Sequence, residues 1–275
     1  MVGRADCQRH AKEKVGGLTL AAVPLAVKVE RDGRLLRLTL ARPKTNLIDM
    51  AMADAVRGAL DTHRNDDKLL AVFIDHEGPH FSYGASIPEH LPETCAGMLA
   101  GMHACIRAMV AFPLPILVAI RGFCLGGGLE LASAGTFLFA APNATLGQPE
   151  IKLAVFAPTA SVLLPERIGQ PRADELLLTG RTLDGVEAER IGLVTRTAND
   201  PVTAALDWFD SHLADKSAPA LRAAVAAARK GYVERVLEKL DWVEKHYLTE
   251  LMRHDDPIEG LRAFMEKRPP VWRHR

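Results

Sequence analysis

A wholly apolar segment at residues 116–120 runs almost directly into three consecutive glycines, and this junction constrains the fold most. The segment ILVAI has the length and composition of a buried strand. After the glycines at 126–128, the sequence LELASAG is typical of the start of a helix. A strand, a glycine-rich turn and a helix in close succession are characteristic of proteins in which helices pack on a sheet.

The surrounding sequence continues this alternation of strands and helices. Two alternating apolar and polar stretches flank Asp32-Gly33, a strong turn pair, and predict a hairpin over residues 25–43. Further elements are predicted as a helix capped by Asp49, a strand near 69–76, a helix near 94–111 ended by Pro113 and Pro115, and two short strands within 136–153. After about residue 158 the chain is mainly helical. We therefore predict an α/β fold.

Three parts of the chain differ in composition. The first residues, MVGRADCQRHAKEK, are polar and lack the apolar stretch of a secretory signal, so we interpret residues 1–22 as an N-terminal extension. Residues 23–216 carry the strand and helix alternation and form the predicted core. Residues 217–275 are alanine-rich and then amphipathic, which predicts a C-terminal helical region that packs on the core or on a neighbouring subunit.

The overall composition argues against several classes of partner. Lysine and arginine total 34, as do aspartate and glutamate, so a nucleic-acid partner is not expected. No apolar run reaches about 18 residues, so no membrane span is expected. The four cysteines contain no C-x-x-C pair, which disfavours a zinc site and favours reduced thiols in a cytoplasmic protein.

Several known sequence motifs are matched only in part. HEGPH at 76–80 matches the zinc-protease letters, but Gly78 and Pro79 prevent the helix that would place both histidines on one face, so no metal is expected. The glycine run is followed by Leu129 and Glu130, where a phosphate loop needs a lysine and a hydroxyl. The dinucleotide-binding spacing and the serine nucleophile elbow are also absent.

The glycine run still has a chemical use. Backbone N–H groups exposed where a helix begins favour negative charge, either a phosphate or the oxyanion of a polarised thioester. The alternative is a tight turn before an ordinary glutamate in the first helical turn. FSYGAS at 81–86 offers a second glycine-containing loop, and Glu150 follows a proline in TLGQPEIKL. Two carboxylates near an anion hole suit acid–base chemistry on water.

Taken together, these segments resemble the crotonase, or enoyl-CoA hydratase/isomerase, superfamily. The similar segments run in family order and are ARPKTNLIDM, FSYGASI, AIRGFCLGGGLELA, LGQPEIKL, LLLTGRTLDGVEAERIGLV and EGLRAFMEKRPP. The resemblance implies a core of repeated ββα units wound as a spiral, with a C-terminal helical region. It also implies a homotrimer or a homohexamer built as a dimer of trimers. Coenzyme A would enter as part of an acyl-CoA substrate, without a further cofactor.

The resemblance also assigns roles to individual residues. It implies an oxyanion hole made by the backbone N–H groups of Ala85 and Gly127, and a pair of catalytic glutamates at Glu130 and Glu150. Contacts with coenzyme A or the substrate fall by the same resemblance on Lys44, Tyr83, Ser86, Ile87 and Gly126. Family members that lack hydratase activity often lack one or both glutamates, so the retained pair implies addition or removal of water.

Two departures from the common family pattern lie near the acyl pocket. Ser86 stands where an aspartate is common, and AVFAPTAS replaces a glycine-rich stretch after Glu150. In both places the chain resembles the dienoyl-CoA hydratases that act on cyclohexa-1,5-diene-1-carbonyl-CoA to give 6-hydroxycyclohex-1-ene-1-carbonyl-CoA. That reaction is a 1,4-addition, so its acid must reach across a ring. The alternatives are a general enoyl-CoA hydratase and an enoyl-CoA isomerase, which needs no bound water.

Overall fold

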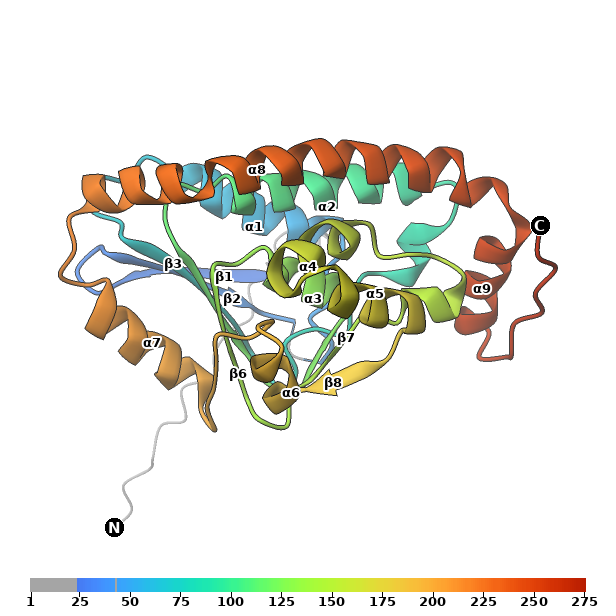
Figure 1. The fold of residues 1–275 in the computed structure, drawn as a ribbon, viewed down its shortest axis with the longest axis horizontal. Helices are drawn as coiled ribbons and strands as arrows, with labels where there is room; N and C mark the ends of the chain where they lie inside the picture. Colours follow the sequence, from blue (N-terminus) through green and yellow to red (C-terminus); the bar gives the residue numbers. More distant parts are fainter. Residues whose placement is uncertain (1–23, 43) are drawn as a thin grey trace, which may run out of the picture.

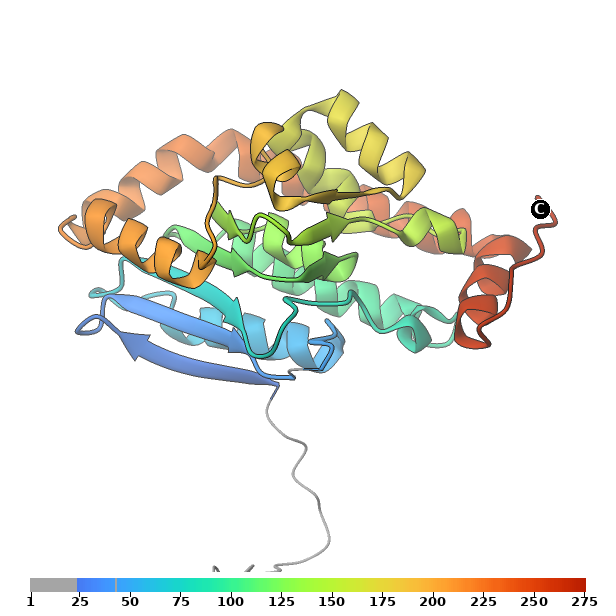
Figure 2. The same ribbon diagram turned by 90° about the horizontal axis from the view of Figure 1, so that it is seen from below.

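The computed structural model describes residues 24–42 and 44–275, so the predicted extension at 1–22 lies outside the described residues. Strands form two sheets, seen along the lower half of Figure 1 and from below in Figure 2. The larger sheet has the order β1-β2-β3-β4-β6-β9 and is parallel except for the β1–β2 pair. In the smaller sheet β7 pairs with β5 in parallel and with β8 antiparallel.

The strands are short, and their bounds are β1 Leu25–Glu30, β2 Leu35–Leu40, β3 Ala71–His76, β4 Ile116–Ile120, β5 Phe123–Leu125, β6 Phe137–Ala140, β7 Thr145–Gly147, β8 Thr182–Asp184 and β9 Arg196–Thr197. The helices are α1 Met50–His63, α2 Cys95–Val110, α3 Gly127–Ser133, α4 Pro158–Ile168, α5 Gln170–Thr179, α6 Gly185–Arg190, α7 Pro201–His212, α8 Ala218–Thr249 and α9 Asp255–Met265. Short 3₁₀ turns are η1 Ile87–His90, η2 Glu150–Leu153 and η3 Leu251–Arg253.

Alternate side chains of the central strands pack on opposite faces of the larger sheet. In β3, Val72 and Ile74 belong to the core shared with α1 and α2, whereas Ala71 and Phe73 face α7. The central strands β3 and β4 are buried along their whole length, as expected for parallel strands covered on both faces. In this three-layer arrangement β4, the strand that precedes the glycine run, is packed on both faces.

The longer predicted elements are confirmed, as is the short strand β7, whereas three other short strands were missed. The hairpin forms around Asp32 and Gly33, which both adopt positive φ, and the Asp49 side chain accepts the N–H of Met52 as the cap of α1. The missed strands are β5, β8 and β9. Strands of two or three residues are too short to show an alternating pattern, so only tertiary pairing identifies them.

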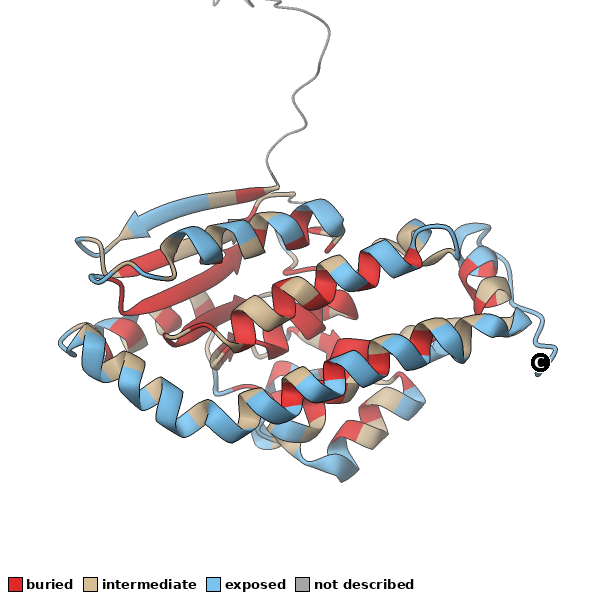
Figure 3. Cartoon of the chain, turned by 90° about the horizontal axis from the view of Figure 1, so that it is seen from above, coloured by how far each residue is buried: buried red, intermediate tan, exposed pale blue. Residues whose placement is uncertain are grey.

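The C-terminal helices cover the core from one side. Helix α8 runs the length of the molecule in Figure 1 and packs on α2 and α4, while Figure 3 shows that its outward face is exposed. Helix α9 then packs beside η1 and η2. The predicted boundary between residues 216 and 217 stays a prediction, although α8 begins close to it. No helix within the described part of the chain has the length and apolarity needed to cross a membrane.

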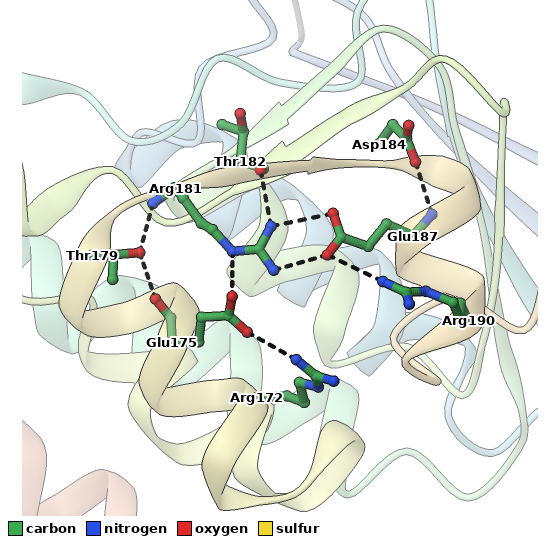
Figure 4. Close-up of polar contacts among 8 residues, drawn as sticks. All are labelled: Arg172, Glu175, Thr179, Arg181, Thr182, Asp184, Glu187 and Arg190. Carbon is green, nitrogen blue, oxygen red and sulfur yellow. Dashed lines mark hydrogen bonds and ion pairs between the residues drawn. The ribbon is translucent and has the colours of Figure 1, made fainter.

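An ion-pair network ties the smaller sheet to its neighbouring helices (Figure 4). Arg181 donates to Glu175 and Glu187, each at 2.9 Å, and thereby joins α5, the start of β8 and α6. Because these side chains are partly exposed, each pair contributes only about 0.2–1 kcal/mol. The network helps to hold β8 beside β7, the strand that leads into Glu150.

Candidate active site

The junction between β5 and α3 brings the glycine run against Glu150. Gly126 has φ 48° and ψ −127°, a conformation that favours glycine. Its N–H donates to the carbonyl of Gly147 at 2.9 Å, which attaches the junction to β7. A Cβ on Gly126 would lie 2.6 Å from Glu150 Oε1. The backbone of the glycine run therefore approaches the carboxylate more closely than any larger residue would allow.

Two backbone N–H groups face the same small space. The backbone N of Ala85 lies 3.1 Å from the point that a Cβ on Gly127 would occupy. The Ala85 loop is held by the N–H of Ile48, which donates to Gly84 O at 2.9 Å, and by that of Leu125, which donates to Ser82 O at 3.1 Å. Within residues 24–42 and 44–275, neither the Ala85 nor the Gly127 N–H has a hydrogen-bond acceptor. They are paired donors suited to an oxyanion.

Glu130 is a buried carboxylate beside this pair. It lies in the first turn of α3, only 6% of its surface is exposed, and its Oε1 accepts the N–H of Ala160 at 2.9 Å. Burial raises the pKa of Glu130 to about 7, against the opposing effect of the backbone hydrogen bonds from Ala160 and Thr159. Near neutral pH this side chain is therefore available in both protonation states.

Glu150 lies at the start of η2, directly after the GQP turn. With its NH₂ group turned toward the carboxylate, the Gln148 amide donates to both Glu150 oxygens at 3.0 and 3.1 Å. Burial, followed by the negative charge of Glu130, raises the pKa of Glu150 to about 8. The two carboxylates thus share a site that disfavours ionisation of both at once, which is the arrangement needed for one acid and one base.

Two cavities meet these groups. An outer, largely apolar pocket is lined by Gly84, Ala85, Gly126 and Glu150, and by the α9 side chains Leu261, Phe264 and Met265. An inner cavity of about 20 Å³ has Glu130 in its wall, and this volume holds about one water molecule. Ala85 and His90 line both spaces. Ala85 therefore stands between an outer pocket with Glu150 and an inner one with Glu130.

The HEGPH segment has a structural role. Strand β3 ends at His76, whose Nε2 accepts the N–H of Arg121 at 3.3 Å. Nδ1 of His80 accepts the N–H of Phe123 at 3.1 Å. Both rings thereby fix the connection between β4 and β5 that precedes the glycine run. The interpretation of this segment as a turn from strand to loop is confirmed.

Comparison with known proteins identifies the chain. The sequence profile of the enoyl-CoA hydratase/isomerase family matches residues 30–275. The chain belongs to the enoyl-CoA hydratase/isomerase family. A cyclohexa-1,5-dienecarbonyl-CoA hydratase from Thauera aromatica is 57% identical, over 93% of this chain and 99% of that protein. A probable enoyl-CoA hydratase from Mycobacterium bovis is 36% identical, over 90% and 98%.

Solved structures agree with this assignment. A putative enoyl-CoA hydratase from Mycobacterium avium paratuberculosis has a TM-score of 0.81 and 29% identity, covering 92% of this chain and 100% of that one. An enoyl-CoA hydratase/isomerase from Pseudoalteromonas atlantica has a TM-score of 0.80 and 26% identity, covering 90% and 99%. The predicted crotonase fold, with its α/β core and C-terminal helical region, is confirmed.

The structure brings together most of the residues singled out from the sequence. Ala85, Glu130 and Glu150 line the two cavities, and the outer pocket is also lined by Tyr83, Ile87 and Gly126. Gly127 lies directly against Ala85. Lys44 is exposed and Ser86 caps η1, and neither lines these two cavities. Their contact with coenzyme A stays a prediction, as do the catalytic roles of the other members of this enoyl-CoA hydratase/isomerase site.

Sequence reasoning missed the residues contributed by distant helices. Lys152 lines the outer pocket two positions after Glu150, where its charge was a visible signal. The inner cavity is lined by His90 of η1 and His103 of α2, and nothing local in the sequence shows that they face Glu130. Thr159 of α4 lines it as well and belongs to AVFAPTAS, the stretch that the sequence placed near the acyl pocket.

The raised pKa of Glu150 predicts a pH dependence of stability. Between its ordinary pKa of 4.5 and about 8, the folded chain keeps a proton that the unfolded chain has released. The free energy of unfolding should therefore fall as pH rises through this window, by up to about 1.4 kcal/mol per pH unit. Above pH 8 this residue should cause no further loss. Glu150→Gln removes this loss. We expect the variant to gain stability relative to the wild type from pH 5 to pH 8 in urea unfolding, and parallel curves would contradict this.

Proposed function

We propose that the protein is a hydratase that adds water to a cyclic conjugated dienoyl-CoA, namely cyclohexa-1,5-diene-1-carbonyl-CoA, and forms 6-hydroxycyclohex-1-ene-1-carbonyl-CoA. The observation that carries the proposal is the 57% identity with the Thauera aromatica hydratase over nearly the whole of both chains. The retained pair of buried glutamates beside two free N–H groups supports it chemically. Coenzyme A is part of the substrate, and the proposed chemistry uses no further cofactor or metal.

The reaction begins at the thioester carbonyl. Its oxygen accepts the N–H groups of Ala85 and Gly127, so negative charge that develops there is stabilised by donors already in place. Each such donor contributes about 3–4 kcal/mol to lowering the barrier. The pantetheine chain then follows the outer pocket past Tyr83 and Ile87, and the acyl ring points toward the inner cavity.

The glutamates handle the water. One ionised carboxylate takes a proton from water as the oxygen bonds to the β-carbon, and the electrons of the adjacent double bond move to the thioester oxygen. Because burial raises both pKa values and the charge of Glu130 raises that of Glu150 further, the pair holds about one proton at neutral pH. One carboxylate is then free to act as the base, while the protonated one positions the water.

The ring of the substrate changes which carbon takes up the proton in the last step. In a linear enoyl thioester the enolate takes a proton at the α-carbon. In the cyclic diene the charge extends over a dienolate, and protonation at its far end places the remaining double bond in conjugation with the carbonyl. Water therefore adds in a 1,4 sense, with hydroxyl and hydrogen on carbons that lie across the ring from each other.

A panel of CoA thioesters tests the proposal. The wild-type enzyme should hydrate cyclohexa-1,5-diene-1-carbonyl-CoA with a higher kcat/KM than crotonyl-CoA, as followed by ultraviolet absorbance and product mass. Faster turnover of crotonyl-CoA would instead support the general enoyl-CoA hydratase. An isomerase would shift the double bond without taking up oxygen from H₂¹⁸O, so a product that lacks the label would contradict hydration.

We further propose a homotrimer or a dimer of trimers that acts in the cytoplasm. The family resemblance supports this assembly, and so do apolar side chains left exposed on the C-terminal helices and tail, namely Trp242, Phe264, Met265, Val271 and Trp272. Such side chains are more often found in subunit contacts than on free surfaces. Sedimentation of the enzyme as a monomer at micromolar concentration would contradict the assembly.

A further inference from the structure

The inner cavity carries a histidine that the chemistry described so far does not use. His103 lies on α2, is 1% exposed, and forms part of the wall of the cavity that also contains Glu130. Its Nδ1 lies 2.6 Å from Glu244 Oε2 on α8. Its Nε2 is buried without a hydrogen-bond partner among the described residues. A buried nitrogen left unpaired costs stability, and a catalytic role is one of the explanations for such an atom in a native protein.

The pairing with Glu244 fixes what Nε2 can do. With Nδ1–H donating to the carboxylate, the neutral ring presents a lone pair at Nε2, and the protonated ring presents an N–H there. The carboxylate stabilises the protonated ring once it forms. Figure 3 shows α2 and α8 lying side by side, and the Glu244 side chain is 29% exposed. The pair thus links the inner cavity to solvent, from which a proton can be recovered.

Glu130 and His103 line the same inner cavity. Ala85 lines both spaces, and Glu150 lines the outer pocket. An acyl ring whose carbonyl is held at Ala85 and directed inward therefore meets Glu130 and the wall formed by α2. That wall consists of Met98, Leu99, Met102 and His103. The methionine side chains are flexible enough to move aside for a ring.

We propose that His103, held by Glu244, is the acid that protonates the far carbon of the dienolate, and the base that removes this proton in the reverse reaction. The inference rests on the proposed function, because only a ring diene needs a proton at that position. Protonation of a linear substrate occurs next to the carbonyl, within the region of the glutamates. His103 meets the requirement for an acid that reaches across the ring.

Water bonds to the β-carbon as a glutamate takes its proton, and the electron pair displaced from the double bond moves onto the thioester oxygen. The dienolate then forms a C–H bond at its far carbon with the proton on Nε2 of His103, whose electron pair returns to nitrogen. The glutamate ends protonated and the histidine neutral. Proton exchange with solvent restores both, and the net change is addition of one water.

The test compares His103→Gln with the wild type on cyclohexa-1,5-diene-1-carbonyl-CoA. We expect kcat to fall by at least about 100-fold while KM changes by less than about threefold, because the glutamine fills the space but cannot transfer the proton. Glu244→Gln should lower kcat by about tenfold or more, since it leaves the ring in place but removes the charge. His246→Gln is the matched control. His246 is an exposed histidine two positions after Glu244 on α8, and this variant should keep full activity.

Isotope exchange separates a proton-transfer role from a structural one. The wild type, given the hydroxylated product in D₂O, should exchange the hydrogen on the far carbon, and His103→Gln should not. Exchange by the variant at the wild-type rate would overturn the proposal, as would a kcat within threefold of the wild type. A wild-type enzyme that leaves the ring diene unchanged overturns the proposed function as well. An active wild type with an unaffected variant overturns only the role of His103.

Discussion

Glu150→Gln should lower kcat for hydration by about 10²–10⁴-fold, with KM nearly unchanged, and Glu130→Gln should do the same. The amide keeps the shape of each side chain, and in Glu130→Gln it keeps an oxygen to accept the N–H of Ala160. Each substitution removes the basic carboxylate oxygen that must take a proton from water. Single-turnover and steady-state hydration of the cyclic dienoyl-CoA measure the effect.

The control is a glutamate of the same size away from the cavities. Glu166→Gln on α4 removes a charge that pairs with Arg235 at 2.7 Å but touches neither cavity. Its kcat should stay within about twofold of the wild type, since exposed pairs contribute little to the fold. Near-normal hydration by either Glu130→Gln or Glu150→Gln would remove that residue from the mechanism.

The features that sequence predicted well are those fixed by neighbouring residues. Asp49 caps α1 because its side chain reaches the N–H of Met52, three positions along the chain. Asp32 and Gly33 turn the hairpin because both tolerate positive φ. Short motifs that combine glycine turns with a carboxylate single out Glu130 and Glu150, whose catalytic roles stay predictions. In each case the necessary information lies within a few residues.

The residues of α2 that line the inner cavity could not be predicted from neighbouring residues in the sequence. In α2, His103 sits among Met98, Leu99, Met102 and Ile106, so the sequence shows only an apolar helix with one histidine. Which face of α2 meets Glu130 depends on how the helix packs between the core and α8. The partner Glu244 lies 141 residues further along the chain. Contacts of this kind follow from tertiary packing, which overrides what a short window can indicate.

The glycine run depends both on local sequence and on tertiary packing. Its position between a strand and a helix was readable from the sequence, but the reason for each glycine was not. Gly126 is required because a side chain there would collide with the Glu150 carboxylate. Gly127 is required because the Ala85 backbone lies against it. Both neighbours come from other loops, so the purpose of the run appears only when the three segments are assembled.

Gly127→Ala should lower kcat by about 10²–10³-fold, the cost of losing one oxyanion donor. The added methyl would stand 3.0 Å from the Cβ of Ala85 and 3.1 Å from its backbone N. It would push the two N–H groups apart and occupy the space that the thioester oxygen needs. Because Gly127 has no positive φ and begins a helix, alanine is compatible with the backbone, so the fold should survive.

Gly58→Ala separates this effect from that of adding a methyl to any helix. A Cβ at Gly58, exposed within α1, meets no atom within 4 Å, so this variant should gain about 0.5–1 kcal/mol in stability and keep its activity. Thermal unfolding and kcat are measured for both variants. Gly127→Ala with kcat within threefold of the wild type would mean that the carbonyl is polarised elsewhere. A large loss of kcat in a variant that still unfolds cooperatively would locate the oxyanion between Ala85 and Gly127.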